Sequence, residues 1–270
     1  MDENQLKSHV RINDILLGPL ERPALAWLAK KMPSWVTPDM LTGLGLFASL
    51  LIFFSYWMTS INKGFLWLAS FGLLLNWFGD SLDGNLARTR HIERPRYGMF
   101  IDHVIDTISE ILVFMGLGLS PYIDFRVAMV GLVSYLSVSI MVYLVMMTRG
   151  VFRISMAKIG PTEIRVMGIM ANTLMFFFGV PKVWTPFGAT SLFNVFAILV
   201  SIMLMVFFLI ETIHTGKILE NEDEYSRQMK LLNEQKKQAR IEARNLKKGT
   251  HKQSQKRPYY WKSKPEEVLH

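Results

Sequence analysis

The chain has 270 residues, half of them apolar, and a formal net charge of +8. This apolar content, with 18 phenylalanines, 17 methionines and 7 tryptophans, is typical of a chain that lies mainly in lipid and argues against an ordinary soluble domain. The chain contains no cysteine, which excludes disulfides, thiolate metal sites and cysteine nucleophiles, so any metal must bind through oxygen or imidazole ligands.

The N-terminal segment, residues 1–34, is predicted to hold an amphipathic helix. Between residues 12 and 32, apolar residues alternate with Arg, Glu and Lys at helical spacing. A helix that lies in the membrane interface and a helix that packs on the rest of the protein both fit this pattern.

Six apolar runs follow, each long enough to cross the ~30 Å hydrocarbon core of a bilayer, which takes about 20 helical residues. They lie near 41–60, 65–87, 97–120, 126–148, 164–180 and 189–211. The sequence therefore predicts an all-α integral membrane protein with six transmembrane helices in residues 35–211.

Basic residues are concentrated in two of the connections between these runs. The first connection contains Arg88, Arg90, Arg94 and Arg96, and the second contains Arg149, Arg153, Lys158 and Arg165. The remaining connections hold only Lys63, Arg126 and Lys182. Because basic loops stay on the cytoplasmic side, both termini and the two basic loops are expected there.

Residues 212–270 form a polar, basic tail. Their composition predicts a helix that continues the sixth run, followed by disorder beyond Gly249. The simplest interpretation is a solvated tail, although its basic residues with Tyr259, Tyr260 and Trp261 also suit contact with anionic headgroups. No nucleic-acid partner is expected, since no nucleic-acid-binding module is recognisable here.

Four aspartates stand at the ends of the second and third apolar runs. Asp80 and Asp83 are three residues apart, and Asp102 and Asp106 are four apart, so each pair lies on one face of its helix. A charged Asp at a membrane-helix centre costs ~2.5–3.5 kcal/mol on insertion scales, and four converging carboxylates also repel one another. A hard divalent cation offsets both costs, which predicts a Mg²⁺ or Mn²⁺ site. A plain ion network with neighbouring arginines is the simpler alternative.

Small and basic residues follow the first aspartate pair. Gly84 leaves a spot without a side chain, where a planar base or a phosphate can approach the backbone. Ala87 lies three residues further along, and Arg88 offers a guanidinium fork suited to a diphosphate. Taken singly, a small residue on a membrane helix more often serves helix packing.

The string Asp80-x2-Asp83-Gly84-x2-Ala87-Arg88-x9-Gly98-x3-Asp102-x3-Asp106 resembles the signature of the CDP-alcohol phosphatidyltransferase family, with every fixed position filled. The resemblance covers roughly residues 35–210. It implies six membrane helices around a cytoplasm-facing polar cavity. It also implies transfer of a substituted phosphate from a CDP-linked donor to an alcohol acceptor in phospholipid biosynthesis, with CMP as the leaving group.

The same resemblance implies roles for individual residues. Asp80, Asp83 and Asp102 are implied to bind metal, two Mg²⁺ or Mn²⁺ ions, with Asp106 contributing to the site and deprotonating the acceptor hydroxyl. The nucleotide is implied to border Gly84, Ala87, Arg88 and Gly98.

The segment Thr37-Pro38-Asp39-Met40-Leu41-Thr42 resembles the Pro-Asn-x-x-Thr entry that the family usually has at its first span. Asp39 stands where the family has an asparagine. This chain is therefore not expected to use the side-chain amide that the family has at this position.

Four further residues bear on catalysis and on the substrate. His103 follows the third aspartate, which resembles the choline and ethanolamine phosphotransferase branch; it either assists Asp106 or packs against a neighbouring helix. The Gly160–Arg165 segment, with Glu163, resembles the same branch, whereas Arg165 also suits a phosphate-bearing acceptor, as in the inositol-phosphate branch. Glu110, one turn beyond Asp106, either lines the acceptor pocket or bonds to a neighbouring helix. These features leave the donor and the acceptor open.

Two other classes of membrane protein also place acidic residues in helices. A membrane-embedded prenyltransferase has its two aspartate motifs far apart in sequence, and an ion transporter is expected to carry its acids near the midplane. Neither fits as well as the transferase. The expected partners are the CDP-linked donor, the alcohol acceptor and membrane lipids, with a homodimer also considered.

Overall fold

The structure is a computed structural model that describes residues 10–12, 16–149, 151–153, 160–185 and 188–254, with side chains in 16–148, 160–185 and 188–244. Some residues singled out above lie outside the described residues or side chains: Arg149, Arg153, Lys158, Tyr259, Tyr260 and Trp261.

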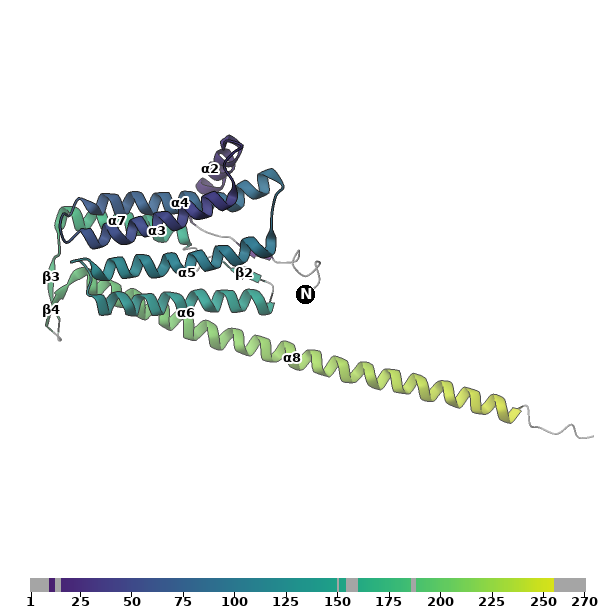
Figure 1. The fold of residues 1–270 in the computed structure, drawn as a ribbon. Helices are drawn as coiled ribbons and strands as arrows, with labels where there is room; N and C mark the ends of the chain where they lie inside the picture. The colour runs from purple at the N-terminus through teal and green to yellow at the C-terminus, as the bar shows by residue number, and fades with distance from the viewer. Residues whose placement is uncertain (1–9, 13–15, 150, 154–159, 186–187, 255–270) are drawn as a thin grey trace, which may run out of the picture. The chain divides into compact units, whose positions relative to one another are not determined.

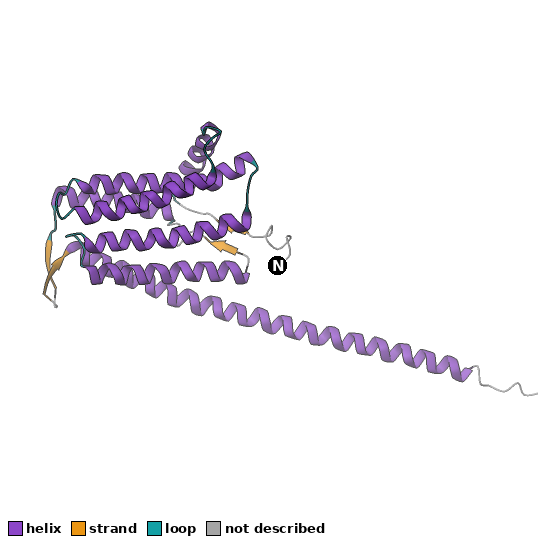
Figure 2. Cartoon of the chain, in the orientation of Figure 1, coloured by secondary structure: helices purple, strands orange, loops and turns teal. Residues whose placement is uncertain are grey.

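The described residues are almost entirely helical (Figures 1 and 2). The helices are α2 (Gly18–Lys31), α3 (Pro38–Met58), α4 (Phe65–Arg90), α5 (Pro95–Leu119), α6 (Phe125–Arg149), α7 (Pro161–Phe178) and α8 (Leu192–Ser254). Strand β1 (Val10–Ile12) pairs in parallel with β2 (Val151–Arg153), and β3 (Lys182–Thr185) pairs antiparallel with β4 (Gly188–Ser191). The all-α class expected from the sequence is confirmed.

Among the described residues, helices α3, α4, α6 and α8 are long and apolar enough to cross a membrane. Helices α5 and α7 coincide with the third and fifth predicted runs but do not meet that standard. Three acidic residues, Asp102, Asp106 and Glu110, interrupt α5. Helix α7 is long enough, but its polar residues, including Glu163, Arg165 and Asn172, lower its mean hydropathy. Six crossings stay a prediction.

The helices of the bundle pack in the order α7, α4, α3, α5, α6, so that α3 contacts both α4 and α5 (Figure 1). Large apolar side chains remain exposed on the outside of α3 and α4, including Phe47, Phe54, Trp57, Phe71 and Leu74. An exposed apolar surface of this kind is typical of helices that face lipid.

Helices α3 and α4 approach each other backbone to backbone near Gly79. A Cβ atom at Gly79 would lie 2.6 Å from the carbonyl oxygen of Leu41 and 2.7 Å from the amide nitrogen of Gly45. On the same face of α4, Asn76 Nδ2 donates hydrogen bonds of 3.1 Å to the Gly45 carbonyl and to Ser49 Oγ. This close contact brings the aspartate-bearing end of α4 against the start of α3.

A second polar link joins α3, α4 and α7 inside the apolar core. The hydroxyl of Tyr56 donates to Asn172 Oδ1 at 2.9 Å, and Asn172 Nδ2 donates to Ser70 Oγ at 3.1 Å. All three residues are buried. Because buried polar groups destabilise a fold unless they are hydrogen-bonded, this network favours one arrangement of the three helices.

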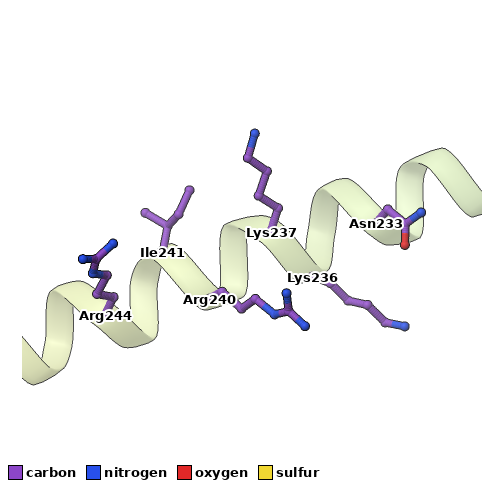
Figure 3. A pocket seen from close by; sticks show the side chains of 6 residues that line it. All are labelled: Asn233, Lys236, Lys237, Arg240, Ile241 and Arg244. Carbon is purple, nitrogen blue, oxygen red and sulfur yellow. The ribbon is translucent and has the colours of Figure 1, made fainter.

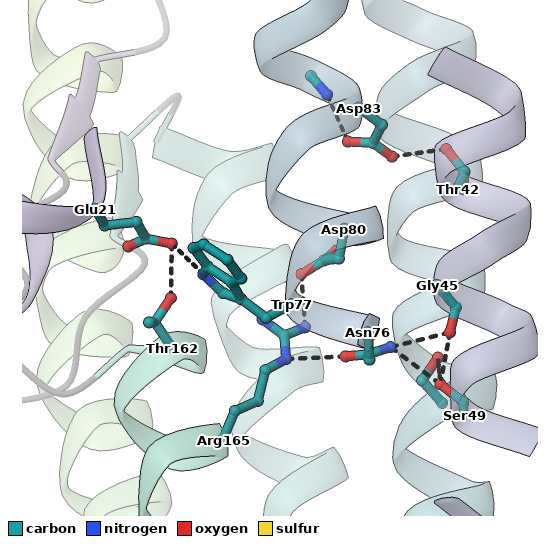
Figure 4. Close-up of polar contacts among 12 residues, drawn as sticks. Glu21, Thr42, Gly45, Ser49, Asn76, Trp77, Asp80, Asp83, Thr162 and Arg165 are labelled. Carbon is teal, nitrogen blue, oxygen red and sulfur yellow. Dashed lines mark hydrogen bonds and ion pairs between the residues drawn. The ribbon is translucent and has the colours of Figure 1, made fainter. Parts of the chain in front are cut away.

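Helix α2 packs on the bundle with one face, through Leu25 and Ala29, which are buried in a cluster with residues of α3 and α4. Its Glu21 Oε1 accepts hydrogen bonds of 2.8 Å from Trp77 Nε1 and from Thr162 Oγ1 (Figure 4). Leu20 and Trp27 remain exposed. The contacts support packing on the bundle, and an interfacial position for the exposed side stays a prediction.

The chain divides into two compact units, Met1–Thr212 and Ile213–His270. Helix α8 is continuous over 63 residues, beginning in the first unit and ending at Ser254 in the second. In the second unit, Lys236, Lys237, Arg240 and Arg244 project from the helix in different directions (Figure 3). They come from one helix and do not enclose a site. The predicted disorder beyond Gly249 falls mostly on residues outside those described, and α8 is helical up to Ser254.

Candidate active site

The four aspartates of the motif line one small cavity. Asp80 and Asp83 come from α4, and Asp102 and Asp106 come from α5. The remaining lining residues are Thr42 and Gly45 of α3, Asn76 of α4, and Ile105 and Ser109 of α5. Helix α3 contacts both α4 and α5 and so brings the two aspartate pairs to the same cavity.

The connection between α4 and α5 is short because the sequence ends one helix and starts the next within four residues. His91 adopts the left-handed conformation, with φ 55°, at the C-terminus of α4, where the amide of Ile92 donates to the carbonyl of Ala87 at 3.1 Å. Pro95 occupies the first turn of α5, a position where its missing N–H costs nothing. Arg94 in this connection pairs with Asp39 at the start of α3. Asp39, which stands where the family has an asparagine, therefore links the connection between α4 and α5 to the start of α3.

Neutral donors hold Asp83 in place. Thr42 Oγ1 donates to Asp83 Oδ2 at 2.6 Å, and the backbone amide of Gly84 donates to Asp83 Oδ1 (Figure 4). Because both donors are neutral, they orient the carboxylate without cancelling its charge. Asp83 therefore keeps the ability to bind a cation.

Asp80 has a different partner. Arg165 of α7 donates through Nη2 to Asp80 Oδ2 at 2.6 Å and through Nε to Asn76 Oδ1 at 2.8 Å (Figure 4). The simpler alternative drawn from the sequence placed the aspartates in ion pairs with Arg88, Arg90 or Arg94. The pair seen at Asp80 is instead made with a helix 85 residues further along the chain.

On α5, Asp102, His103 and Asp106 offer ligand atoms that all lie within 4.8 Å of one another. The imidazole of His103 also stacks on Tyr143 of α6, with ring centroids 4.2 Å apart and an interplanar angle of 24°. His103 is thus next to the base expected at Asp106 and is also packed against a neighbouring helix, so both sequence interpretations stay open.

The residues expected at the nucleotide lie beside the first aspartate pair and at the start of α5. A Cβ atom at Gly84 would lie 3.3 Å from Arg88 Nη1, so the guanidinium of Arg88 extends over Gly84. Ala87 is half-buried in the same turn. A Cβ atom at Gly98 would meet nothing within 4 Å, so the backbone there is open.

The acceptor candidates differ sharply in their contacts. The buried Glu163 uses both of its oxygens in the fold. Its Oε1 accepts from the amide of Leu17 at 2.8 Å, which joins α7 to the chain before α2, and its Oε2 accepts from the amide of Gly160 at 2.8 Å, which caps the N-terminus of α7. Arg165 is engaged with Asp80. Glu110 accepts from Ser139 Oγ at 3.2 Å through Oε1, whereas its Oε2 is buried and has no hydrogen-bond partner.

Thr42, Asn76 and Ser109 line the cavity but were not among the expected site residues. Two of them could have been found from helical spacing, because Asn76 precedes Asp80 by four residues and Ser109 follows Asp106 by three. Thr42 has no such neighbour in its own helix. Its only signal is its place in the Thr37–Thr42 segment.

Comparison with known proteins gives one family and several relatives. Residues 35–210 match the family model for CDP-alcohol phosphatidyltransferase. The chain is 28% identical over 181 residues to cholinephosphotransferase 1 of Gallus gallus, which covers 63% of this chain and 52% of that protein. It is 36% identical over 98 residues to cholinephosphotransferase 1 of Xenopus laevis, covering 34% of this chain and 24% of that protein.

A bacterial protein of another specificity is also similar. The phosphatidylinositol phosphate synthase of Cutibacterium acnes is 34% identical over 86 residues, covering 31% of this chain and 38% of that protein. The chain thus spans about half the length, or less, of these relatives. The family match extends over the motif and over the helices that build the cavity, and the chain belongs to the CDP-alcohol phosphatidyltransferase family.

Proposed function

We propose that this protein is an integral membrane enzyme of phospholipid biosynthesis. It transfers a phosphatidyl or phospho-alcohol group from a CDP-linked donor to an alcohol and releases CMP. The observation that carries the proposal is the single cavity lined by Asp80, Asp83, Asp102 and Asp106 in a chain of this family.

The carboxylates fit a hard divalent cation such as Mg²⁺ or Mn²⁺. Asp102 and Asp106 offer ligand atoms close to each other, and Asp80 and Asp83 line the same cavity. Such a cation, when bound, supplies positive charge to the donor diphosphate and to the departing CMP. Two ions are expected from the family resemblance.

The chain's own residues supply positioning and proton transfer. Arg88, which lies over Gly84, binds the donor diphosphate, while Ala87 and Gly98 leave room for the nucleotide. The acceptor oxygen attacks the phosphorus that carries the group to be transferred, and the bond from this phosphorus to the CMP oxygen breaks. The hydroxyl proton passes to Asp106. Direct attack suits a chain without cysteine, in which the sequence offers no Ser–His pair.

The membrane arrangement belongs to the same proposal. Six helices in residues 35–211 cross the bilayer, with the cavity and both termini on the cytoplasmic side, where the basic connections lie. The N-terminal segment and the basic tail flank this catalytic domain. The homodimer stays a prediction.

The test uses the purified full-length protein in detergent or vesicles with Mn²⁺ or Mg²⁺. We expect CMP to bind, and we expect CMP release from CDP-choline, CDP-ethanolamine or CDP-diacylglycerol when the matching acceptor is present. Excess EDTA should abolish turnover, because four carboxylates and a diphosphate repel each other without a cation.

Two results would overturn the proposal. A protein that binds no CMP and releases none from any donor would point to the prenyltransferase or the transporter. Full turnover in excess EDTA would remove the metal from the reaction.

A further inference from the structure

The facing surfaces of α5 and α6 carry a row of polar and aromatic residues next to the aspartate cavity. His103 stacks on Tyr143, Glu110 bonds to Ser139, and Phe114 contacts Tyr135 at a centroid distance of 6.0 Å. The numbers rise along α5 as they fall along α6, as expected for two antiparallel helices in contact. The residues on α6 are four apart, which places them on one face.

Glu110 is the acidic member of this row. Its Oε2 is buried and has no hydrogen-bond partner, and its Oε1 has only the neutral hydroxyl of Ser139. Arg94, Arg126 and Arg165 each form an ion pair with another carboxylate. A buried carboxylate without a cation is costly. The arrangement is therefore suited to a positive charge that arrives with a ligand.

The groups around Glu110 favour an organic ammonium ion over a metal ion. Tyr135 and Tyr143 lie one helical turn to either side of Ser139, the residue of α6 that donates to Glu110, and they share its helix face. Aromatic rings beside a carboxylate favour an organic ammonium, which binds to the faces of the rings as well as to the charge. A metal ion would want more oxygen ligands than Glu110 and Ser139 offer.

The position of Glu110 connects this site with the reaction. Glu110 lies one helical turn beyond Asp106 on the same face of α5, at a spacing of about 5–6 Å between Cβ positions. The two-carbon spacer of an ethanolamine-type alcohol is shorter than this. One substrate can therefore place its oxygen near Asp106 and, through hydrogen-bond or ion-pair distances at both ends, its nitrogen near Glu110.

We infer that Glu110, with Tyr135 and Tyr143, binds the ammonium group of an amino alcohol, and that this protein selects an ammonium-bearing substrate over neutral polyols. The inference rests on the proposed function and adds the chemical class of the substrate. The ammonium arrives either on the CDP-linked donor or on a free acceptor alcohol, and the same recognition applies to both.

The experiment compares substrates that carry an ammonium group with substrates that do not. In the first arm, the full-length protein receives diacylglycerol with either CDP-choline or CDP-3,3-dimethylbutanol, in which carbon replaces the quaternary nitrogen. In the second arm, it receives CDP-diacylglycerol with ethanolamine, serine, inositol or glycerol. We expect the ammonium-bearing substrate to be preferred by about tenfold or more in kcat/KM in one arm, and that arm identifies its source.

Glu110→Gln keeps the shape of the side chain and removes its charge. We expect the KM of the preferred substrate to rise about tenfold or more and the preference over the neutral substrate to disappear. Binding of CMP should be unchanged, which also shows that the variant is folded. Glu21→Gln is the matched control, because it removes a carboxylate that bonds to Trp77 and Thr162 away from the cavity, and it should leave the preference intact.

The remaining outcomes separate a failure of the ammonium site from a failure of the proposed function. If CMP is released but the wild-type protein treats the choline and dimethylbutanol donors alike, or prefers inositol or glycerol, the ammonium site is wrong and the proposed function stands. The same holds if Glu110→Gln binds CMP and keeps the preference. If no donor releases CMP, the proposed function itself fails. The comparison of wild-type preferences needs no variant, so a failure of Glu110→Gln to fold does not stop the test.

Discussion

The four aspartates share one cavity but have different neighbours. Asp80 faces the guanidinium of Arg165, and Asp83 is held by the hydroxyl of Thr42. Asp106 lies on α5, one turn from Asp102. We propose separate tasks, in which Asp80, Asp83 and Asp102 bind the cation and Asp106 also accepts the proton.

Substitution of single aspartates tests this separation. Asp106→Asn keeps the shape and some ability to coordinate but cannot accept a proton from the acceptor. We expect turnover to fall by ~10²-fold or more while CMP still binds, which is the usual effect of a lost general base. Asp80→Asn should instead weaken the binding of both Mn²⁺ and CMP. CMP release and CMP binding by calorimetry measure the two effects.

The assignment of Asp106 would be abandoned if Asp106→Asn turned over normally, or if it lost metal and CMP as completely as Asp80→Asn. His103→Ala is a parallel variant. A loss as large as that of Asp106→Asn would put His103 in the proton path, and a small loss would leave it as the partner of Tyr143.

Thr42 is expected to position Asp83 for the cation. Thr42→Val keeps the volume of the side chain and removes the donor to Asp83 Oδ2, so the Mn²⁺ concentration for half-maximal activity should rise about 10- to 100-fold, as is typical for lost partners of metal ligands. Thr42→Ser restores the hydroxyl and should restore most of the affinity. Equal metal dependence in Thr42→Val and the wild-type protein would show that this hydrogen bond has no such role.

At the scale of elements, the contact between α3 and α4 positions the first aspartate pair. The contact is close because Gly79 has no side chain, and an added Cβ would collide with backbone atoms of Leu41 and Gly45. Backbone atoms cannot move aside as a flexible side chain can. The spacing of the two helices, and with it the reach of Thr42 to Asp83, depends on this glycine.

Gly79→Ala is therefore expected to destabilise the protein by about 1–3 kcal/mol, the usual cost of overpacking, and to reduce activity. The measurement is thermal unfolding in detergent with CMP release alongside. Gly43→Ala is the matched control on α3, because a Cβ atom there meets nothing within 4 Å. If the two variants unfolded at the same temperature, the close contact would not be important for stability.

Arg90 of α4 binds the segment that connects α2 with α3. Its guanidinium donates to the carbonyls of Pro33 at 2.7 Å and Met32 at 3.2 Å, and also to those of Ser34 and Val36. These four carbonyls belong to the segment between the two helices. Arg90 thus belongs to the basic connection after α4 and also holds the segment between α2 and α3 against the end of α4.

At the scale of the whole molecule, the family match and the cavity both lie within the first compact unit. Truncation after Lys247 removes only residues of the second unit. We expect the truncated protein to insert into membranes and to retain most of its CMP release. A variant that inserts and folds but is inactive would assign the tail a part in catalysis.

Several features could be predicted from the sequence because they depend on local spacing. Apolar runs of suitable length indicated the helices, and the intervals from Asp80 to Asp83 and from Asp102 to Asp106 placed each pair on one helix face. The eight fixed positions of the motif indicated the family, which the comparison confirmed. The charges that mark α5 as part of a site are also what keeps it below the apolar standard for a span.

The partners of the site residues were decided only by the tertiary structure. Thr42 reaches Asp83 across 41 residues, Arg165 reaches Asp80 across 85, and Ser139 reaches Glu110 across 29. Helical spacing relates only residues within a turn or two, so no pattern along the chain predicts these pairs. Glu110 illustrates the difference, because the sequence placed it one turn beyond Asp106, whereas its buried and unpaired oxygen depends on how α6 packs against α5.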